Sequence, residues 1–496
     1  MSKKQEIENQ IISMIRQGVL APGERLPSIR RMAQEYNVSM TPVTDAYSEL
    51  VATRWLESRP NSGFYVSEQP GEQAAQNTLS LNASEHYGLL DDFLSGYSQI
   101  AVNSSNNIRF PFGTTSTNIR MYQEPQFNQF LIRAVQSPSI SGSGLIELHD
   151  EADLKRGIMK WMLACRCKNS VEDISIVHSV TEGLLLAVRA CARPGSTIAV
   201  EAPGHAGFYF ISHFLDCRVL PVPSRPDTGL DIDAFEAMLR SGSRPACLLL
   251  CANFSNPTGA LMPDSGKQRL AKLCAEFAVP IIEDDVLGEL YFGDTRPLPL
   301  KSFDNENVIY VSGFGKCLNP VLRMGYVSAG RYRDAFAFQK HLAVSYTNPY
   351  LQRALSNYLE SGQAGRHAAA YRSRLKKNVG IFREKLLDAF PAGTEAAMPA
   401  GGPYLWVTLP DGIDAEKLCS RAISCGISIA PGRLYNAAET QKNAFRFNCG
   451  TVAPDADSLK AVETLSQLAV SLLTSQADRR SAQDTPVCAR RQTTGA

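Results

Sequence analysis

The sequence has no excess of charge of either sign. Its 496 residues include 50 Lys and Arg against 49 Asp and Glu, which leaves a formal net charge of +1. Residues 1–68 are equally balanced, with eight basic and eight acidic side chains. A general polycationic attraction to nucleic acid is therefore excluded, and any DNA binding must depend on where single cations are placed.

Metal-binding and membrane-spanning patterns are also missing. The twelve cysteines form no CxxC, and neither Cys165 and Cys167 nor Cys247 and Cys251 have a His at zinc-ligand spacing. We interpret the cysteines as reduced core thiols and expect no metal site. No apolar run approaches the length of a membrane span, and no apolar signal core follows the first residues. These absences favour a cytoplasmic protein.

The length and the composition indicate a globular protein of more than one domain. Hydrophobic residues make up 44% of the chain and charged residues 20%, and 496 residues exceed one ordinary domain. We expect domains at residues 1–68 and 108–475, a Gln-, Asn- and Ser-rich linker at 69–107 with a short helix at 89–100, and a polar, disordered tail at 476–496.

The first domain combines three short helical patterns with two strand-like runs. Helices are expected over residues 4–18 and 29–36 and from about residue 40, and strands over 55–59 and 63–66. Ser28 can cap the second helix, and Ser39 or Thr41 can cap the third. Three helices and a hairpin indicate a winged helix-turn-helix, although a helical protein-interaction module has the same elements.

A winged helix-turn-helix places its third helix in the major groove of DNA and its hairpin on the backbone or in the minor groove. Polar side chains at the start of the third helix suit phosphate or base contacts, and Arg side chains in the second helix and the hairpin suit phosphates. The DNA-binding residues expected on these grounds are Arg30, Arg31, Ser39, Thr41, Thr44, Arg59 and Gly63.

Two longer strings are more specific than the helical patterns. Residues 22–30 read PGERLPSIR, and residues 59–66 read RPNSGFYV. With these strings the chain resembles the DNA-binding domain of the GntR family over residues 5–67. The resemblance implies DNA contacts from Arg30, Ser39, Thr41 and Gly63. Members of this family usually carry Arg where this chain has Met40, so their usual Arg-to-guanine contact has no counterpart here.

Strands and helices alternate along most of the remaining chain. Buried strands are expected at residues 174–177, 197–200, 246–251, 279–283 and 308–311, with helices such as 181–191 and 264–277 between them. This order is typical of an α/β domain with a mostly parallel sheet. Beyond Pro391 the pattern changes to a small α+β C-terminal subdomain with strands at 404–409 and 445–448.

Motifs at the expected strand ends supply parts of a site for an aldehyde cofactor. Such a site needs a Lys that binds the aldehyde covalently, a phosphate cup, and an acid beside a pyridine nitrogen. Lys316 follows a strand in the string YVSGFGK, and Arg323 comes seven residues later as a forked phosphate ligand. Asp284 ends the strand in PIIED, where a buried carboxylate would keep a pyridine nitrogen protonated.

Further motifs complete this set. The amide of Asn256 in the turn NPTG can donate to a phenolic oxygen, His205 can stack on a flat ring, and Arg446 can bind a carboxylate. Backbone N–H groups at a helix start can hold phosphate, here those of Ser179, Val180 and Thr181. Each motif alone has an ordinary explanation as a turn, a cap or a solvated cation. The order and spacing of the whole set favour a cofactor site.

The set resembles the fold type I pyridoxal-phosphate enzymes of the aspartate aminotransferase group over residues 110–470. Joined to a GntR-type head, it is similar to the MocR subfamily of regulators. The resemblance implies pyridoxal 5'-phosphate as cofactor and Lys316 as the catalytic residue that binds its aldehyde. It also implies that the pyridine nitrogen pairs with Asp284, the phenolic oxygen with Asn256, the phosphate with Arg323 and Thr181, the ring with His205 and a carboxylate with Arg446.

The chain departs from that pattern at several positions. Relatives usually carry hydroxyl residues where this chain has Gly313 and Gly315, and a Tyr where it has Val286 or Leu287. Their Tyr-x-x-Pro-x-Gly segment aligns with residues 145–155, which contain no Tyr. Each missing hydrogen bond to a charged group removes about 1.5–3 kcal/mol. We expect weaker cofactor binding and little or no transamination.

The leading hypothesis is a regulator in which the cofactor, or its adduct with a small amino-compound effector, shifts the large domain and with it the DNA-binding heads. One alternative is an active aminotransferase that carries a DNA-binding domain. Another is a DNA-binding protein whose large domain serves only for dimerisation. Because fold type I sites form at a subunit interface, and because paired half-sites suit a two-fold protein, we expect a homodimer.

Overall fold

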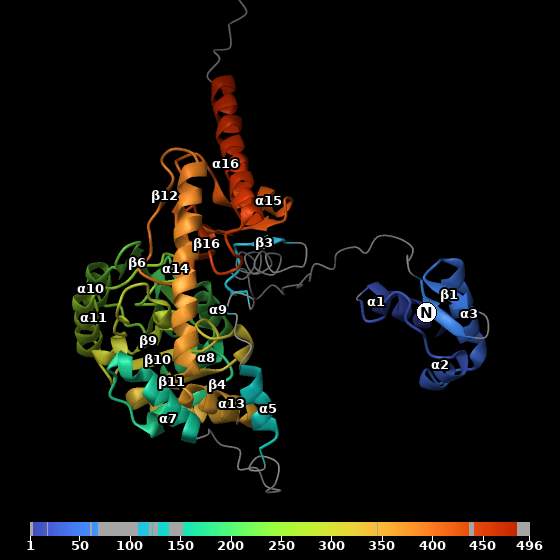
Figure 1. Cartoon of the computed structure of the whole chain (residues 1–496), viewed down its shortest axis with the longest axis horizontal. Coiled ribbons are helices and arrows are strands. Elements are labelled where there is room, and N and C mark those ends of the chain that lie inside the picture. The colour runs from blue at the N-terminus through green and yellow to red at the C-terminus, as the bar shows by residue number, and fades with distance from the viewer. Residues whose placement is uncertain are drawn as a thin grey trace, which may run out of the picture. The chain divides into compact units, whose positions relative to one another are not determined.

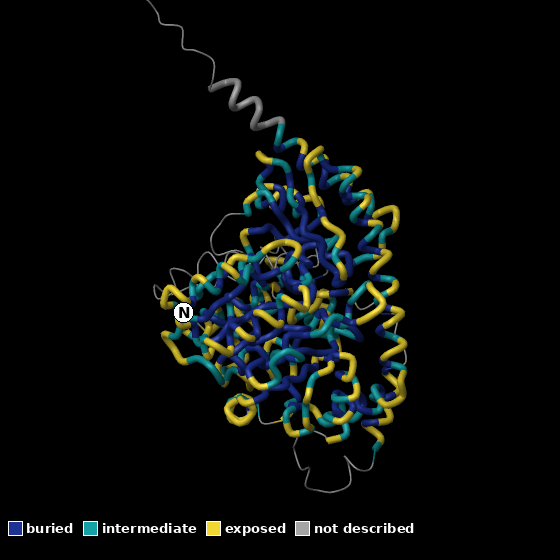
Figure 2. The backbone as a smooth tube through the Cα atoms, turned by 90° about the vertical axis from the view of Figure 1, so that its left-hand side faces the viewer, coloured by how far each residue is buried: buried dark blue, intermediate teal, exposed yellow. Residues whose placement is uncertain are grey.

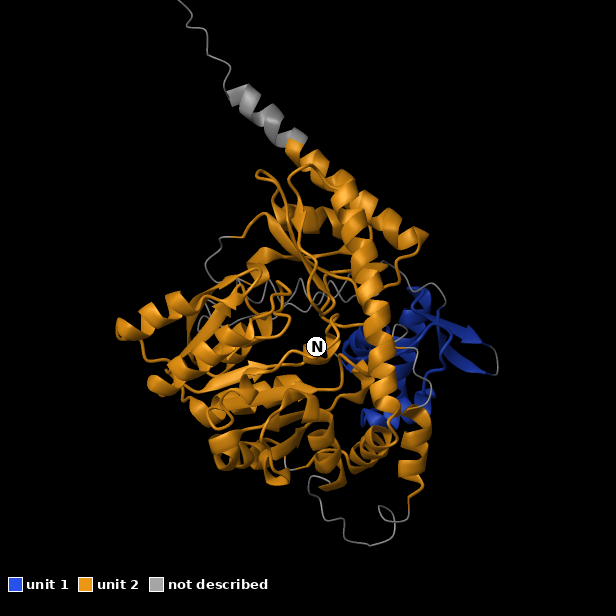
Figure 3. Cartoon of the chain, turned by 60° about the vertical axis from the view of Figure 1, so that its left-hand side comes forward, with its two compact units in different colours: residues 1–87 blue, residues 88–496 orange. Residues whose placement is uncertain are grey.

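The chain forms two compact units, residues 1–87 and residues 88–496 (Figure 3). The computed structural model describes residues 3–16, 18–59, 62–67, 108–118, 122, 127–137, 152–344, 346–435 and 441–483, with side-chain surroundings up to residue 473. The predicted linker at 69–107, with its helix at 89–100, lies outside the described residues. None of the described helices is both long and apolar enough to span a membrane.

The small unit has the predicted three helices and hairpin. The elements are α1 (Lys3–Arg16), α2 (Ile29–Glu35), α3 (Met40–Ala52), β1 (Leu56–Arg59) and β2 (Gly63–Val66). The two strands pair antiparallel, with Arg59 opposite Gly63. One core holds the helices together, because the apolar face of α3 packs against Ile7 and Ile11 of α1.

The helix starts follow the predictions at one cap and depart from them at the other. Ser28 caps α2, where its side chain accepts a hydrogen bond from the backbone N of Arg31 at 3.3 Å. Ser39 occupies the N-cap position of α3 but forms no side-chain cap bond, and Thr41 lies inside the helix. The predicted N-cap position of Ser39 is therefore confirmed, whereas the side-chain bond is absent and Thr41 is not the cap. Pro42 stands at the third helical position and has no N–H to donate to such a cap.

The large unit is built on an eight-stranded sheet (Figure 1). Its order is β4 (Ile174–Val177), β11 (Gly325–Ser328), β10 (Val308–Gly313), β9 (Ile281–Asp284), β8 (Leu248–Leu250), β5 (Thr197–Ala202), β6 (Arg218–Arg225) and β7 (Gly229–Leu230). The five central strands from β10 to β6 are parallel to one another. This is the predicted, mostly parallel sheet.

Helices cover both faces of this sheet. Leu249 and Ile282 point to one face, where they pack with α8 (Val180–Cys191), α9 (Ala206–Phe214) and α12 (Arg333–Ala343). The neighbouring Leu248 and Ile281 point to the other face, beneath α10 (Ile232–Arg240) and α11 (Asp264–Glu276). The central strands are apolar at successive positions because both of their faces are buried, as the dark interior of Figure 2 shows.

A smaller α+β part completes the unit. Its antiparallel sheet contains β12 (Glu395–Ala396), β13 (Tyr404–Thr408), β16 (Ala444–Asn448) and β15 (Ala430–Pro431). The helices α14 (Gln363–Ala389), α15 (Ala415–Ile423) and α16 (Ala456–Gln483) pack beside it, and Figure 1 shows α14 rising alongside the large sheet toward α16. The short β3 (Phe110–Pro111) pairs with β14 (Ile427–Ser428).

The predicted disordered tail starts too early. Helix α16 continues to Gln483, beyond the expected boundary at residue 476. Its apolar contacts include Val462, Leu465 and Leu472. The sequence turns polar after these residues, which led to the wrong boundary, although a helix that is already nucleated can extend over polar residues with high helix propensity.

Candidate functional site

The motifs predicted from the sequence meet at one edge of the large sheet. Strands β10, β9, β8 and β5 run parallel, and β4 runs in the same direction because it and β10 are both antiparallel to β11. The carboxyl ends of these strands therefore lie along the same edge, which is where open α/β sheets bind ligands.

A cavity of about 270 Å³ lies at this edge. Every residue predicted to contact the cofactor lines it: Ser179, Val180, Thr181, His205, Asn256, Asp284, Lys316 and Arg323. Residues from five strand ends are thus brought within reach of one small ligand.

Lys316 lies three residues beyond the end of β10 and is partly buried. Its Nζ donates a hydrogen bond to the backbone carbonyl of Thr115. The hydroxyl of Tyr122 donates to the carbonyl of Lys316 itself at 3.0 Å, which fixes the backbone from which the side chain extends.

Asp284 faces the cavity, whereas the adjacent Asp285 belongs to the core. Asp285 accepts hydrogen bonds from Arg296 at 2.5 Å and from the Tyr310 hydroxyl at 2.9 Å. Burial raises the pKa of Asp284 to about 7, and the charge of Asp285 adds to this effect, while the Val286 backbone N–H and Lys316 oppose it. A positive partner in the cavity would favour the ionised form of Asp284.

His205 is held as a neutral ring. Its Nδ1 accepts a hydrogen bond from the backbone N of Gly207 at 3.0 Å, so the proton of the neutral ring lies on Nε2. Burial lowers the pKa of His205 to about 3, and the nearby cations Arg446 and Lys316 lower it further. A neutral imidazole can stack on a pyridinium ring without charge repulsion.

The start of α8 is arranged to receive an anion. The Ser179 side chain accepts from the backbone N of Glu182 at 3.1 Å, so the N–H groups of Val180 and Thr181 precede the first intrahelical bonds. Glu182, an acid next to the predicted phosphate cup, accepts a hydrogen bond through Oε2 from the backbone N of His178 at 2.5 Å. Its Oε1 is buried and has no hydrogen-bond partner among the described residues.

Arg323 supplies a cation to the same cavity. It has a left-handed backbone with φ of 38°. Non-glycine residues rarely adopt this conformation, and such strain concentrates at functional sites. Within the described residues no ion pair involves Arg323.

Asn256 and Arg446 form a connected pair. Arg446 donates from Nη1 to Oδ1 of Asn256 at 3.0 Å, which leaves the Asn256 amide nitrogen as the donor for a ligand. Nη2 of Arg446 donates to the carbonyl of Gly113 at 2.7 Å. Arg446 is 0% exposed and is not among the residues that line the cavity. The predicted carboxylate-binding residue is therefore next to the cavity but covered.

The residues at which the chain departs from the family pattern differ in how much space surrounds them. A Cβ atom on Gly313 would lie 2.9 Å from Cγ2 of Val180 and 3.1 Å from the backbone of Met324, so a side chain has no room there. Gly315 is open, since the nearest atom to its Cβ position is 3.9 Å away. Val286 and Leu287 form apolar parts of the cavity wall. Most of the segment 145–155 lies outside the described residues.

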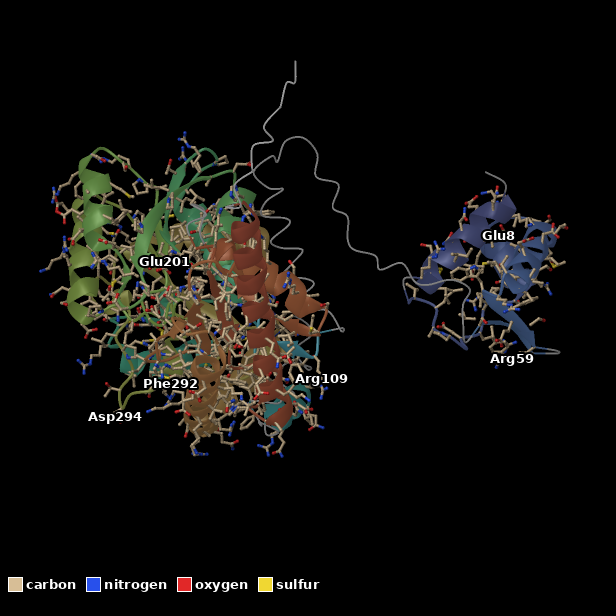
Figure 4. The ribbon with its side chains drawn as sticks, turned by 90° about the horizontal axis from the view of Figure 1, so that it is seen from above. Glu8, Arg59, Arg109, Glu201, Phe292 and Asp294 are labelled. Atoms are coloured by element: carbon tan, nitrogen blue, oxygen red, sulfur yellow. The ribbon has the colours of Figure 1, made fainter. Side chains whose placement is uncertain are left out.

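Sequence reasoning missed part of the cavity wall. The hydroxyl-rich run Thr115, Ser116 and Thr117 lines it together with Tyr404, although these residues are far from Lys316 in sequence. Glu201 on β5 lies behind the wall and is labelled in Figure 4. Its Oε1 accepts from the backbone N of Cys251 at 2.8 Å and from the Ser255 hydroxyl at 3.1 Å, which holds the turn before Asn256. Burial raises the pKa of Glu201 to about 8.

The small unit has an open groove of about 450 Å³ on its surface. Its lining residues are Arg25, Leu26, Ser28, Ile29, Arg30, Met40, Thr44, Gly63 and Phe64. The groove joins the starts of α2 and α3 to the hairpin. Two Arg and no acidic residue line it, although the unit as a whole is balanced in charge.

Three of the predicted DNA-binding residues, Arg30, Thr44 and Gly63, lie in this groove, and four lie outside it. Arg31 pairs with Glu35 at 2.9 Å, and Arg59, on the hairpin in Figure 4, stacks over the Tyr65 ring at 4.3 Å. Ser39 and Thr41 are exposed beside the groove. Arg25 was not predicted, because it reaches the groove through a bridge between its backbone and the hairpin residue Tyr65.

Comparisons with known proteins agree with both units. Residues 105–465 match the family of aminotransferases of class I and II, and residues 3–66 match the bacterial regulatory proteins of the gntR family. The chain is 29% identical to an uncharacterized HTH-type transcriptional regulator of Escherichia coli, YdcR, and 27% identical to another, YjiR; each alignment covers 90% of this chain and 95% of the relative. The structure of LysN, an α-aminoadipate aminotransferase from Thermus thermophilus, is similar with a TM-score of 0.68 and 24% identity over 78% of this chain and 99% of that one.

Proposed function

Because the chain belongs to the aminotransferase class I and II family and carries a gntR-family domain at its N-terminus, we propose that it is a DNA-binding transcriptional regulator of the MocR type, which responds to pyridoxal phosphate and a small amino-compound effector. The observation that carries this proposal is the pairing, in one chain, of a groove with two Arg and no acid and a cavity lined by all the expected cofactor ligands.

The family indicates pyridoxal phosphate as the cofactor, and the donors of the cavity fit it. When bound, this cofactor supplies an aldehyde that reacts with amines and a pyridine ring that accepts electrons. Lys316 would bind the aldehyde, Asp284 the pyridine nitrogen and Asn256 the phenolic oxygen. The phosphate would be held by Arg323 and by the helix start at Ser179, Val180 and Thr181, and the ring would be covered by His205.

The chain's own groups are suited to these tasks. The Asp284 carboxylate is buried and can pair with one positive group in the cavity. Burial and the nearby cations Arg446 and Lys316 keep the His205 ring neutral, and the hydrogen bond from Gly207 leaves its proton on Nε2. Asn256 is oriented by Arg446, so that its amide hydrogens remain for the ligand. His205 and Asn256 are therefore each held in orientation by a contact outside the cavity, as precise binding requires.

The missing hydroxyl groups favour a regulator over the alternative, an active aminotransferase with a DNA-binding domain. Gly313 and Gly315 provide no side-chain hydroxyl for a phosphate, and Val286 and Leu287 provide no hydroxyl for a phenolic oxygen. A steady-state amino-transfer assay separates the two functions: we expect turnover far below that of an aminotransferase, and rapid turnover would favour the enzyme.

An absorbance spectrum of the purified protein with added pyridoxal phosphate tests the cofactor assignment. A new visible band from cofactor bound at Lys316 is expected. A spectrum identical to that of the free cofactor would favour the remaining alternative, in which the large domain serves only for dimerisation.

The proposed regulator is a cytoplasmic homodimer. A two-fold dimer presents two DNA-binding heads to paired half-sites, and cyclic two-fold dimers are the commonest oligomers. Sedimentation at micromolar concentration with cofactor present should give the mass of two chains of 54.2 kDa. A monomer under these conditions would contradict the proposal.

A further inference from the structure

Two backbone carbonyls of one short segment accept hydrogen bonds from Lys316 and Arg446, the two side chains proposed to bind an aldehyde and a carboxylate. The segment is residues 113–117, here called the gate segment. The Thr115 carbonyl accepts hydrogen bonds from Nζ of Lys316 and from the Tyr404 hydroxyl, the latter at 3.2 Å. The Gly113 carbonyl accepts from Nη2 of Arg446 at 2.7 Å.

Other contacts hold the gate segment in this position. The Asn448 side chain donates from Nδ2 to the carbonyls of Thr114 at 2.8 Å and Ser116 at 3.1 Å. On the N-terminal side, Phe112 is fully buried and stacks on Phe447 with a centroid distance of 4.1 Å. Phe112 therefore fixes the N-terminal end of the gate segment, and hydrogen bonds are the main contacts of the gate segment itself.

The contact at Lys316 competes with the aldehyde. As an ammonium, Nζ carries three protons, one of which is given to Thr115. When Nζ forms a double bond to the aldehyde carbon, the aldehyde oxygen leaves as water with two of these protons, so the nitrogen keeps at most one. The hydrogen bond to Thr115 is then lost or strained.

The contact at Arg446 excludes a carboxylate. The guanidinium lies over the rings of Tyr404 and Tyr435, at 4.5 Å and 5.3 Å from their centroids, and its residue is 0% exposed. Its Nε is buried without a hydrogen-bond partner among the described residues. A carboxylate can reach this side chain only after one of the groups that cover it has moved, and the Gly113 carbonyl is one of these groups.

We propose that the gate segment is an autoinhibitory element that occupies Lys316 and Arg446, and that binding of an aldehyde and a carboxylate at these residues displaces it. The inference rests on the proposed function, because it takes both side chains as ligand-binding residues. In sequence, the gate segment lies near the N-terminal end of the large unit, which begins at Gly88 directly after the unit that contains the DNA-binding domain.

A reversible disulfide tests this inference in the full-length protein. A Cβ atom on Gly450 would lie 3.1 Å from Cγ2 of Thr117, so the Cβ atoms of the two residues lie at most about 4.6 Å apart, near the upper end of the range of about 3.5–4.5 Å for a disulfide. The double variant Thr117→Cys, Gly450→Cys can thus lock the gate segment when oxidised and release it when reduced. The single variants Thr117→Cys and Gly450→Cys, treated with the same oxidant and phosphine reductant, are the matched controls.

The readout is incorporation of pyridoxal phosphate at Lys316, trapped with borohydride and located by mass spectrometry. We expect incorporation to be at least tenfold slower in the oxidised double variant than in the same variant after reduction, whereas in each single variant the oxidised and reduced samples should incorporate the cofactor at the same rate. Equal incorporation in the oxidised variant, with the disulfide confirmed by mass, would overturn the gate and leave the proposed function standing. No incorporation in the wild-type protein would overturn both.

A second measurement does not depend on the disulfide. In the wild-type chain, hydrogen exchange of a peptide spanning residues 112–118 should become faster when pyridoxal phosphate binds. Unchanged or slower exchange, with the cofactor bound at Lys316, would also overturn the gate.

Discussion

A hydroxyl group restored at residue 315 should tighten the binding of pyridoxal phosphate. The Cβ position of Gly315 has no neighbouring atom closer than 3.9 Å, and the residue lines the cavity between Lys316 and the α8 start. A Ser there can donate to the phosphate without displacing anything. One hydrogen bond to a charged group contributes about 1.5–3 kcal/mol, so Gly315→Ser should lower the dissociation constant roughly 10- to 100-fold.

The same substitution at residue 313 should not tighten the binding of pyridoxal phosphate. A Cβ atom on Gly313 would meet Val180 Cγ2 at 2.9 Å and the backbone of Met324 and Gly325 at 3.1 Å. Gly313→Ser should therefore destabilise the fold by about 1–3 kcal/mol through overpacking and should not improve binding.

Absorbance titration with pyridoxal phosphate gives the dissociation constants, and Gly315→Ala is the control that adds a methyl group without a hydroxyl. The reasoning is refuted if Gly315→Ser and Gly315→Ala bind equally, or if Gly313→Ser improves binding as much as Gly315→Ser.

Three further outcomes are expected. Lys316→Ala should abolish the visible band of the bound cofactor, and an unchanged band would mean that another residue binds the aldehyde. Arg30→Ala should weaken DNA binding and reduce the salt slope by about 1, whereas Arg31→Ala should change less because Arg31 pairs with Glu35; equal losses in DNA titrations would contradict the role of the groove. The pKa of Glu201, about 8 when folded, exceeds its unfolded value of about 4.3, so the free energy of unfolding should fall as pH rises between these values. Urea unfolding without cofactor measures this free energy in the wild type and in Glu201→Gln. From pH 6 to pH 9 the free energy of unfolding should fall by about 2–3 kcal/mol more in the wild type than in the variant. Parallel pH profiles of the two proteins would argue against a protonated Glu201.

Short sequence patterns predicted those features that depend on neighbouring residues, such as strand ends and helix caps. Asp284 ends an apolar strand and Lys316 lies three residues after another, and the parallel sheet brings such strand ends to one edge. Ser28 was predicted as a cap because the donor it needs, the Arg31 N–H, is only three residues away. These predictions needed only short-range geometry.

Contacts between distant segments could not be predicted in this way. Thr115 is 201 positions from Lys316, and Tyr404 is 289 positions from Thr115, so no spacing rule connects them. The burial of Arg446 has the same origin, since the groups that cover it include the carbonyl of Gly113 and the ring of Tyr404. The sequence motif around Arg446 predicts that its guanidinium can bind a carboxylate, but it does not predict whether the side chain is exposed.

This chain joins a DNA-binding domain to a domain for a cofactor. The coupling of the two is tested most directly by titrating the full-length protein against DNA from its own upstream region, at two salt concentrations and with and without pyridoxal phosphate. We predict binding that weakens with salt and an affinity that changes with the cofactor in the wild type but not in Lys316→Ala. Binding that is absent or insensitive to salt, or an affinity that does not respond to a cofactor shown to be bound, would contradict the account.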